Sequence, residues 1–292
     1  MPLPRPEPCT IRTVLMAFSD YLSGKAVDSP RLSADLICMH VLGTDRLRLI
    51  TESDRPVSVE QWSVMRELVL RRGTGEPAAY LLGTREFYGR EFMVSPHTLI
   101  PRPETEHIID AVVARSSQHT PLTFADLGTG SGCLAVTLAT ELPHAQGIAV
   151  DISPGALSVA SANARKHGVA NRITCVRGSF LTPLFRASTL DCLVTNPPYV
   201  SRKEYSSLSH EVRDFEPESA LVPGPRGVEH ALALIPLAAD WLRPGGCFLM
   251  EMGYTQGEFL LRQLTATPQT WRAAHILRDL AGLDRILYAE RV

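Results

Sequence analysis

The sequence predicts an α/β protein: an open, mainly parallel sheet with helices on both faces, preceded by a small helical bundle and a β-hairpin linker. From residue 122 onward, short apolar runs alternate with helical stretches, which is typical of a parallel sheet covered on both sides. Before residue 75, apolar residues recur at intervals of three and four, the period of helices. We therefore expect three parts: residues 1–75, a linker over 76–106, and a sheet domain over 107–292.

Composition indicates a soluble globular protein and excludes several classes. The 292 residues are 45% hydrophobic and 21% charged, with a net charge of −2, unlike a disordered chain. The basic excess typical of proteins bound to duplex nucleic acid is missing. No stretch approaches the roughly 20 apolar residues of a membrane helix, and the N-terminus lacks the apolar core of a secretory signal. We expect a cytoplasmic protein without membrane contact or direct nucleic-acid binding.

The cysteines do not indicate a metal site. They are scattered, with no C-x-x-C pair and no histidine at zinc spacing. The six are Cys9, Cys38, Cys133, Cys175, Cys192 and Cys247. His210-Glu211 resembles the start of a zinc-protease motif, but Asp214 stands where the second histidine would be. We expect reduced cysteines and no bound metal.

The first 75 residues are expected to form several helices. The apolar positions that define the first are Val14, Leu15, Phe18 and Leu22. Ser29-Pro30 predicts an N-cap followed by proline at the first helical position, and Gly43 predicts the end of that helix. Ser58 begins another. The bundle is interpreted as a partner-recognition module, with a purely structural cap as the alternative.

Residues 76–106 are expected to form a structured linker. Aromatic residues on both sides of Gly89, within Glu86–Phe92, are typical of a hairpin. Three prolines then predict a stiff, extended segment, because proline fixes its own φ and restrains the residue before it. They are Pro96, Pro101 and Pro103.

The last part predicts alternating strands and helices. Strands are expected over Leu122–Leu127, Gly147–Val150, Ile173–Val176, Leu190–Thr195 and Cys247–Met252. Helices are expected over Gly132–Leu142, Pro154–His167 and Val228–Leu242. In such sheets ligands bind beyond the carboxyl ends of the strands.

A glycine-rich segment, residues 126–132 (DLGTGSG), joins the first strand to the following helix. Glycines let backbone approach a ligand closely, and the helix N-terminus offers free N–H groups. Asp151, expected at the end of the second strand, can accept hydrogen bonds from both hydroxyls of a ribose. A nicotinamide dehydrogenase is compatible with this much, and so is a tight turn beside a solvated aspartate. However, the spacing is not G-x-G-x-x-G, and Asp126 suits an ammonium group better than a pyrophosphate.

Asn196-Pro197-Pro198-Tyr199 follows a buried strand. The two prolines remove two N–H donors and stiffen the loop. The groups left facing outward are acceptors, namely the side-chain carbonyl of Asn196 and the main-chain carbonyl of Pro197, and Tyr199 adds an aromatic face. Such a site suits a planar NH₂ group; an ordinary proline-rich turn is the alternative.

These residues together resemble the class I S-adenosylmethionine-dependent methyltransferases that methylate amide or exocyclic amino nitrogens. That resemblance implies a Rossmann-like, mainly parallel seven-stranded sheet. Residues 85–89 (REFYG), 100–106 (IPRPETE) and 212–217 (VRDFEP) are in turn similar to the HemK/PrmC family of protein-(glutamine-N5) methyltransferases. The similarity covers the chain from about residue 75 onward, and the N-terminal helices more loosely.

The resemblance implies methyl transfer from S-adenosylmethionine to glutamine N5 in the Gly-Gly-Gln motif of class 1 peptide chain release factors, which modulates translation termination. The expected catalytic residues are Asn196, Pro197 and Tyr199, and the expected substrate-binding residues are these three together with Pro198 and Arg102. For Arg102, a purely structural role in the linker is the alternative. The implied cofactor-binding residues are Asp126, Gly128, Thr129, Gly130, Ser131, Gly132, Asp151, Phe180 and Asn196. One position departs from the family: Ser179, beside Phe180, stands where an aspartate is common.

Two other functions remain open at this point. Adenine, guanine and glutamine all present a conjugated NH₂ group, so a methyltransferase acting on DNA or rRNA amino groups, or on a ribosomal-protein glutamine, would use the same NPPY motif. A cofactor-binding protein without turnover is the third alternative, and Asn196 argues against it. Glu211, Glu216 and Glu218 are interpreted as solvated acids.

Overall fold

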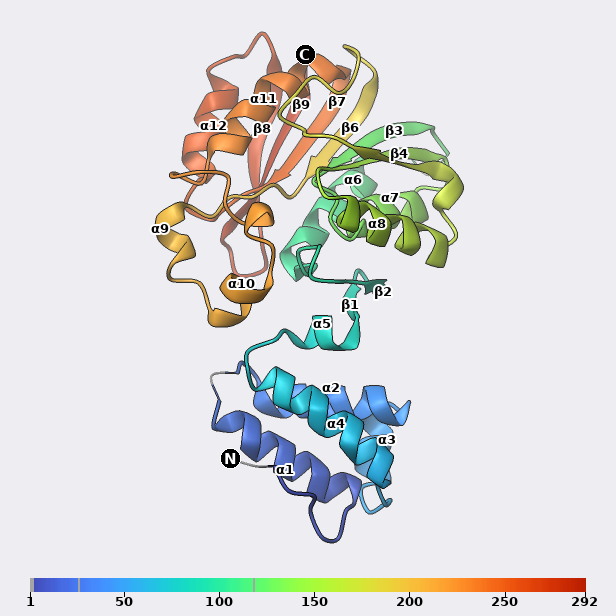
Figure 1. Ribbon diagram of the computed structural model, residues 1–292. Coiled ribbons are helices and arrows are strands. Elements are labelled where there is room, and N and C mark those ends of the chain that lie inside the picture. Colours follow the sequence, from blue (N-terminus) through green and yellow to red (C-terminus); the bar gives the residue numbers. More distant parts are fainter. Residues whose placement is uncertain (1–2, 26, 118) are drawn as a thin grey trace. The chain divides into compact units, whose positions relative to one another are not determined.

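Residues 3–25, 27–117 and 119–292 are described by a computed structural model (Figure 1). They divide into two units. The first comprises the residues up to Thr84 together with Ser209–Phe215, and the second comprises Arg85–Leu208 with Glu216–Val292. No helix in the described ranges is long and apolar enough to cross a membrane.

The first unit is built from helices. They are α1 (Ile11–Ser23), α2 (Pro30–Leu42), α3 (Arg46–Thr51), α4 (Val59–Arg72), α5 (Ala78–Leu82) and α10 (His210–Phe215). Thr10 and Ser58 start α1 and α4 with reciprocal capping boxes, which satisfy N–H groups that the helix leaves open. Phe18 stacks on Trp62 at 5.1 Å in the buried core.

The predicted cap of α2 is confirmed in its position, but it lacks the side-chain hydrogen bond of a capping serine. Ser29 precedes α2, and Pro30 is at its first position, but the Ser29 side chain makes no capping hydrogen bond. Its backbone is left-handed, with φ at 52°, whereas a capping side chain needs extended backbone at this position. The expected end of the helix at Gly43 is confirmed, with φ at 60°.

The short helix α10 belongs to the helical unit although it lies far along the chain. The Arg72 guanidinium, only 3% exposed, pairs with Glu211 at 2.7 Å and donates to Ser33 Oγ and to the Glu76 carbonyl. A nearly buried cation with three partners of this kind is firmly held. Glu211 is therefore a structural acid in this unit, and its interpretation as solvated is wrong.

The second unit begins with the predicted hairpin, formed by β1 (Thr84–Phe87) and β2 (Arg90–Met93). Tyr88 and Gly89 at the turn both have positive φ, 52° and 67°, as a two-residue hairpin turn requires. Phe87 and Phe92 meet edge to face with ring centroids 6.0 Å apart, and both are buried.

The predicted sheet is confirmed, with seven strands in the order β5-β4-β3-β6-β7-β9-β8. All neighbouring pairs are parallel except those of β9 with β7 and β8. The strands are β3 (Leu122–Leu127), β4 (Ala145–Asp151), β5 (Ile173–Arg177), β6 (Leu190–Thr195), β7 (Leu242–Glu251), β8 (Trp271–Arg278) and β9 (Asp284–Arg291).

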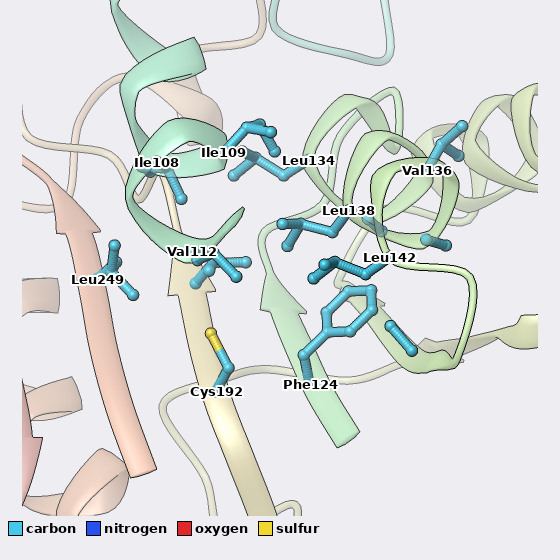
Figure 2. Packing of buried hydrophobic residues seen from close by; sticks show 14 of the residues in the cluster. Ile108, Ile109, Val112, Phe124, Leu134, Val136, Leu138, Leu142, Cys192 and Leu249 are labelled. Carbon is cyan, nitrogen blue, oxygen red and sulfur yellow. The ribbon is translucent and has the colours of Figure 1, made fainter. Parts of the chain in front are cut away.

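Helices cover both faces of this sheet. They are α6 (Glu106–Arg115), α7 (Cys133–Glu141), α8 (Pro154–Lys166), α11 (Glu229–Trp241) and α12 (Gly257–Thr265). The unit also contains the short helix α9 (Arg202–Tyr205) and 3-10 turns at Pro103–Thr105, Ala170–Arg172 and Glu218–Ala220. Apolar residues of α6 and α7 pack on Phe124, Cys192 and Leu249 of the strands (Figure 2). Alternate strand residues, such as Ala125 and Leu193, pack instead with α11 and α12, because successive strand side chains point to opposite faces.

Candidate active site

A pocket opens beyond the carboxyl ends of the central strands. The residues of the second unit that line it include His97, Thr98, Arg102, Thr105, Asp126, Gly128, Thr129, Gly130, Ser131, Asp151, Ile152, Ser179, Phe180, Leu181, Asn196, Pro198 and His230. Strands β3, β4 and β6 end at this pocket. Three predicted site residues, Gly132, Pro197 and Tyr199, are not among the residues that line it.

The glycine-rich loop is shaped by its own backbone and by Asp151. The N–H groups of Gly128 and Thr129 both donate to the Val150 carbonyl at 2.9 Å. Asp151 accepts from the N–H groups of Gly130 and Ser153, each at 2.9 Å. Gly130 has a φ of 54°, a left-handed conformation that favours glycine. Asp151 thus fixes the loop and still keeps lone pairs for a ligand's hydroxyl groups.

Gly132 contributes to the loop without lining the pocket. Its φ is 79°, and a Cβ built there would lie 3.0 Å from the Cβ of Ala160 on α8. A larger side chain would therefore push α8 away from the loop. This glycine permits close helix packing behind the pocket.

Asp126 is buried at the end of β3 with one oxygen unused. Its Oδ2 accepts from Thr129 Oγ1 at 2.6 Å and from the Ala135 N–H at 3.1 Å. Its Oδ1 has no hydrogen-bond partner among the described residues. Burial raises the pKa of Asp126 to about 7, although both hydrogen bonds oppose the shift. An orphaned carboxylate oxygen facing a pocket fits a cationic group such as an ammonium.

An apolar wall forms a different side of the pocket. Phe180 is buried and meets His230 edge to face at 5.5 Å. Ile152, in contrast, is 54% exposed although it lines the pocket. Flat aromatic and aliphatic surfaces of this kind suit an aromatic base. Ser179, at the position where the resemblance leads one to expect an acid, also lines the pocket.

The NPPY segment directs Asn196 and Tyr199 to different places. Asn196 lines the pocket, and its Nδ2 donates to Thr105 Oγ1 at 3.1 Å. The Tyr199 hydroxyl instead donates to Glu251 Oε1 at 3.1 Å. Burial and the neighbouring Glu251 raise the pKa of Tyr199 well above its usual value. Tyr199 is therefore held as a neutral hydrogen-bond donor, and the structure gives it no base-like character.

Two residues that sequence reasoning missed complete this end of the pocket. Thr105 Oγ1 donates to Glu251 Oε2 at 2.5 Å, and the two residues are 2% and 1% exposed. Burial raises the pKa of Glu251, and the hydrogen bonds from Thr105 and Tyr199 oppose that shift. The signal in the sequence that could have indicated Glu251 is that it is the one charged residue in the apolar run Cys247–Met252.

Arg102 reaches the pocket from the proline-rich segment. It pairs with Glu216, whose side chain is 1% exposed, at 2.5 Å, and Glu216 also accepts from the Ile100 N–H at 3.1 Å. The interpretation of Glu216 as a solvated acid is therefore wrong. Glu218 is half exposed and pairs with Arg202, as a surface acid does.

The sheet order, the glycine-rich loop after β3, the acid ending β4 and the NPPY segment after β6 define a class I methyltransferase. The chain belongs to the family of release factor glutamine methyltransferases. It is 49% identical over 282 residues to "Release factor glutamine methyltransferase" of Nitratidesulfovibrio vulgaris, with 97% of this chain and 95% of that protein covered. It is 38% identical to the protein of the same name from Geobacter sulfurreducens, with 97% of each chain covered.

Two regions of the chain also match family models. Residues 13–83 match the family described as PrmC N-terminal domain, and residues 110–213 match Methyltransferase small domain. Among solved structures, the chain is similar to ribosomal protein L11 methylase from Lactobacillus delbrueckii subsp. bulgaricus. That similarity has a TM-score of 0.47 and 21% identity, and it covers 71% of this chain and 88% of the other.

Proposed function

We propose that this protein methylates the side-chain amide nitrogen, N5, of the glutamine in the Gly-Gly-Gln motif of class 1 peptide chain release factors, and that it thereby modulates translation termination. The observation that carries the proposal is Asn196, which lines the pocket after β6 with its NH₂ group bound to Thr105. Its carbonyl oxygen is the group left to bind a substrate NH₂. The release-factor substrate is supported by the names of the relatives.

S-adenosylmethionine fits the other end of the pocket and is the methyl donor of this family. The unpartnered oxygen of Asp126 matches its ammonium group, Asp151 matches its ribose hydroxyls, and the wall at Phe180 matches its adenine. When bound, it supplies a methyl group that the positive charge on sulfur has already activated. The glycine-rich loop brings backbone N–H groups close to this end.

The protein's part in the reaction is to orient a weak nucleophile. An amide nitrogen shares its lone pair with the carbonyl, as the rotational barrier of about 18–20 kcal/mol in a peptide amide shows. The two acceptors assigned to the substrate NH₂ are Asn196 Oδ1 and the carbonyl of the next residue, Pro197, although only Asn196 is among the residues that line the pocket. Hydrogen bonds from both N–H groups to these oxygens fix the direction of the nitrogen and increase its electron density. Orientation of this kind contributes roughly 7–11 kcal/mol at ideal geometry.

The proton of the amide leaves without a strong base at the NPPY segment. The Tyr199 hydroxyl donates a hydrogen bond to Glu251, and its raised pKa keeps it protonated, so it cannot act as the base. Once the nitrogen carries the methyl group, it is positively charged and acidic. It then loses one of its two protons to solvent. Exclusion of water before transfer favours the step, because charge disperses as the methyl group moves.

The helical domain predicted over residues 1–75, which a linker over 76–106 joins to the methyltransferase domain over 107–292, is assigned to recognition of the release factor. None of the described residues of the first unit lines the pocket, and an appended domain of this kind most often selects substrates. Release factors act in the cytoplasm, so the proposed location of the enzyme is the cytoplasm as well. No metal and no nucleic acid are assigned to the reaction.

The proposal is tested by transfer of labelled methyl groups from S-adenosylmethionine to purified release factor. Gly-Gly-Gln and Gly-Gly-Ala versions of the factor are compared, with ribosomal RNA and ribosomal proteins as further substrates. Label on the Gly-Gly-Gln protein alone is expected. Label on RNA or a ribosomal protein, with none on the release factor, would overturn the proposal in favour of the second function considered above.

A further inference from the structure

Behind Asn196, side chains from three distant segments form a buried chain of hydrogen bonds. Asn196 Nδ2 donates to Thr105 Oγ1 at 3.1 Å, and Thr105 Oγ1 donates to Glu251 Oε2 at 2.5 Å. Thr105 precedes α6, Asn196 follows β6, and Glu251 ends β7. Thr105 and Asn196 line the pocket, whereas Glu251 is 1% exposed and lies beneath them.

The carboxylate of Glu251 sets the direction of every hydrogen bond in this chain. An ionised carboxylate only accepts hydrogen bonds, and each Glu251 oxygen faces a hydroxyl, that of Thr105 or that of Tyr199. Thr105 has one hydroxyl proton, and it uses this proton in the hydrogen bond to Glu251. Its oxygen is therefore left to accept, and the partner it requires from Asn196 is the NH₂ group. Burial raises the pKa of Glu251, whereas the hydrogen bonds from Thr105 and Tyr199 and the positive charge of Arg285 oppose that shift and favour the ionised form.

We propose that Thr105 and Glu251 are positioning residues that lock the side-chain amide of Asn196 in one of its two orientations, with the NH₂ group against Thr105 and the carbonyl oxygen available to the substrate. An asparagine amide can rotate by 180° with little change in shape, and the reversed form would present a donor to the substrate. The lock makes Asn196 an acceptor, which selects an amide NH₂ over a carboxylate. This inference rests on the proposed function.

The burial of Glu251 indicates that the chain of hydrogen bonds does more than fill space. A buried carboxylate is costly unless it is fully hydrogen-bonded, and its pKa is raised by burial here. Its neighbours in β7 from Cys247 to Met250 are apolar and buried. An apolar residue would suit the strand equally well, but it could not fix the proton of Thr105.

The test compares Thr105→Val with Thr105→Ser. Valine keeps the shape of threonine and removes the hydroxyl, whereas serine keeps the hydroxyl. We expect kcat for methyl transfer to fall about 30–100-fold in the valine variant, as for loss of a preorganised hydrogen bond, with the cofactor Kd within about 2-fold of the original. The serine variant is expected to retain most of the activity.

Peptide discrimination gives a readout that a merely structural role would not move. The unmodified enzyme is expected to bind a Gly-Gly-Gln peptide more tightly than a Gly-Gly-Glu peptide. In Thr105→Val this preference falls about 10-fold or more, because the reversed Asn196 amide accommodates a carboxylate. Glu251→Gln, which can donate or accept at the same position, lowers the preference as well and supplies a second variant if the valine variant folds poorly.

Thr137→Val is the matched control. Thr137 is a fully buried threonine on α7 outside the pocket, and its hydroxyl has no hydrogen-bond partner among the described residues; its replacement should leave kcat and peptide preference unchanged. Unchanged peptide preference in both Thr105→Val and Glu251→Gln, or equal losses in Thr105→Val and Thr105→Ser, would overturn the inference. If the unmodified enzyme transfers no label to Gly-Gly-Gln protein, the proposed function fails instead.

Discussion

The two ends of the pocket are built in different ways. The cofactor end is built around one short run of sequence, residues 126–132, held largely by backbone hydrogen bonds and by Asp151. The substrate end joins side chains 91 and 146 residues apart in the chain. A contiguous loop produces a spacing that can be recognised, whereas a network of buried side chains leaves only isolated polar residues. A substitution at one end should therefore impair cofactor binding or methyl transfer without impairing the other.

The largest expected effect belongs to Asn196→Ala. Removing the acceptor that holds the substrate amide should lower kcat by about 10³-fold, the cost of losing one preorganised catalytic hydrogen bond. The cofactor Kd, measured by calorimetry, should change little because Asp126, Asp151 and Phe180 are untouched. Equal losses of kcat and of cofactor affinity would show that the two ends are not separable.

Asp151→Ala should weaken cofactor binding and leave kcat nearly unchanged, the opposite of the result expected for Asn196→Ala. It removes the acceptor for the N–H groups of Gly130 and Ser153 as well as a partner for the ribose. The cofactor Kd should rise about 100-fold, as for loss of two hydrogen bonds of about 1.4 kcal/mol each. At saturating cofactor, kcat should stay within about 5-fold of the original. A loss confined to kcat would contradict this division.

Asp126→Asn should stabilise the cofactor-free protein while weakening cofactor binding. The pKa of Asp126 is about 7 in the folded protein, above its usual 3.8, so its contribution to stability is complete below pH 3.8 and is lost as pH rises through 7. The difference in unfolding free energy between the variant and the original protein should therefore grow by about 2–4 kcal/mol, in favour of the variant, as the pH rises from 5 to 8. Denaturant unfolding at the two pH values checks this; parallel pH profiles would refute it.

Two neighbouring glutamates allow a smaller, matched comparison within the second unit. Glu216 is buried with Arg102 and the Ile100 N–H, so Glu216→Gln should cost about 1–3 kcal/mol of stability. Glu218 forms an exposed pair with Arg202, and Glu218→Gln should change stability by less than about 0.5 kcal/mol. Thermal unfolding of both variants decides the matter, and equal shifts would contradict the burial contrast.

The central sheet could be predicted well because its strands carry strong local signals. The bounds of Leu122–Leu127 and Leu190–Thr195 are those of β3 and β6, since both are short buried runs followed by glycine- or proline-rich turns. The last two strands, β8 and β9, are not among the predicted ones. In β8 most side chains are partly or fully exposed, so it lacks the apolar run that marks a buried strand.

The polar framework of the site could not be predicted, for a different reason. Glu211 and Glu216 are five positions apart in one short stretch, yet Glu211 joins the helical unit through Arg72 and Glu216 joins the sheet unit through Arg102. Local sequence carries no sign of such partners, because they come from chain segments more than 100 residues away. The same holds for Thr105 and Glu251.

The measurement that tests the account most directly is the identity of the methylated atom. Release factor labelled by the enzyme is hydrolysed in acid, which cleaves a side-chain amide to a carboxylic acid and an amine. If Asn196 presents an acceptor to the glutamine NH₂, all the label should appear as methylamine. Label that remains on an amino acid or a nucleoside after hydrolysis would contradict methyl transfer to the amide nitrogen.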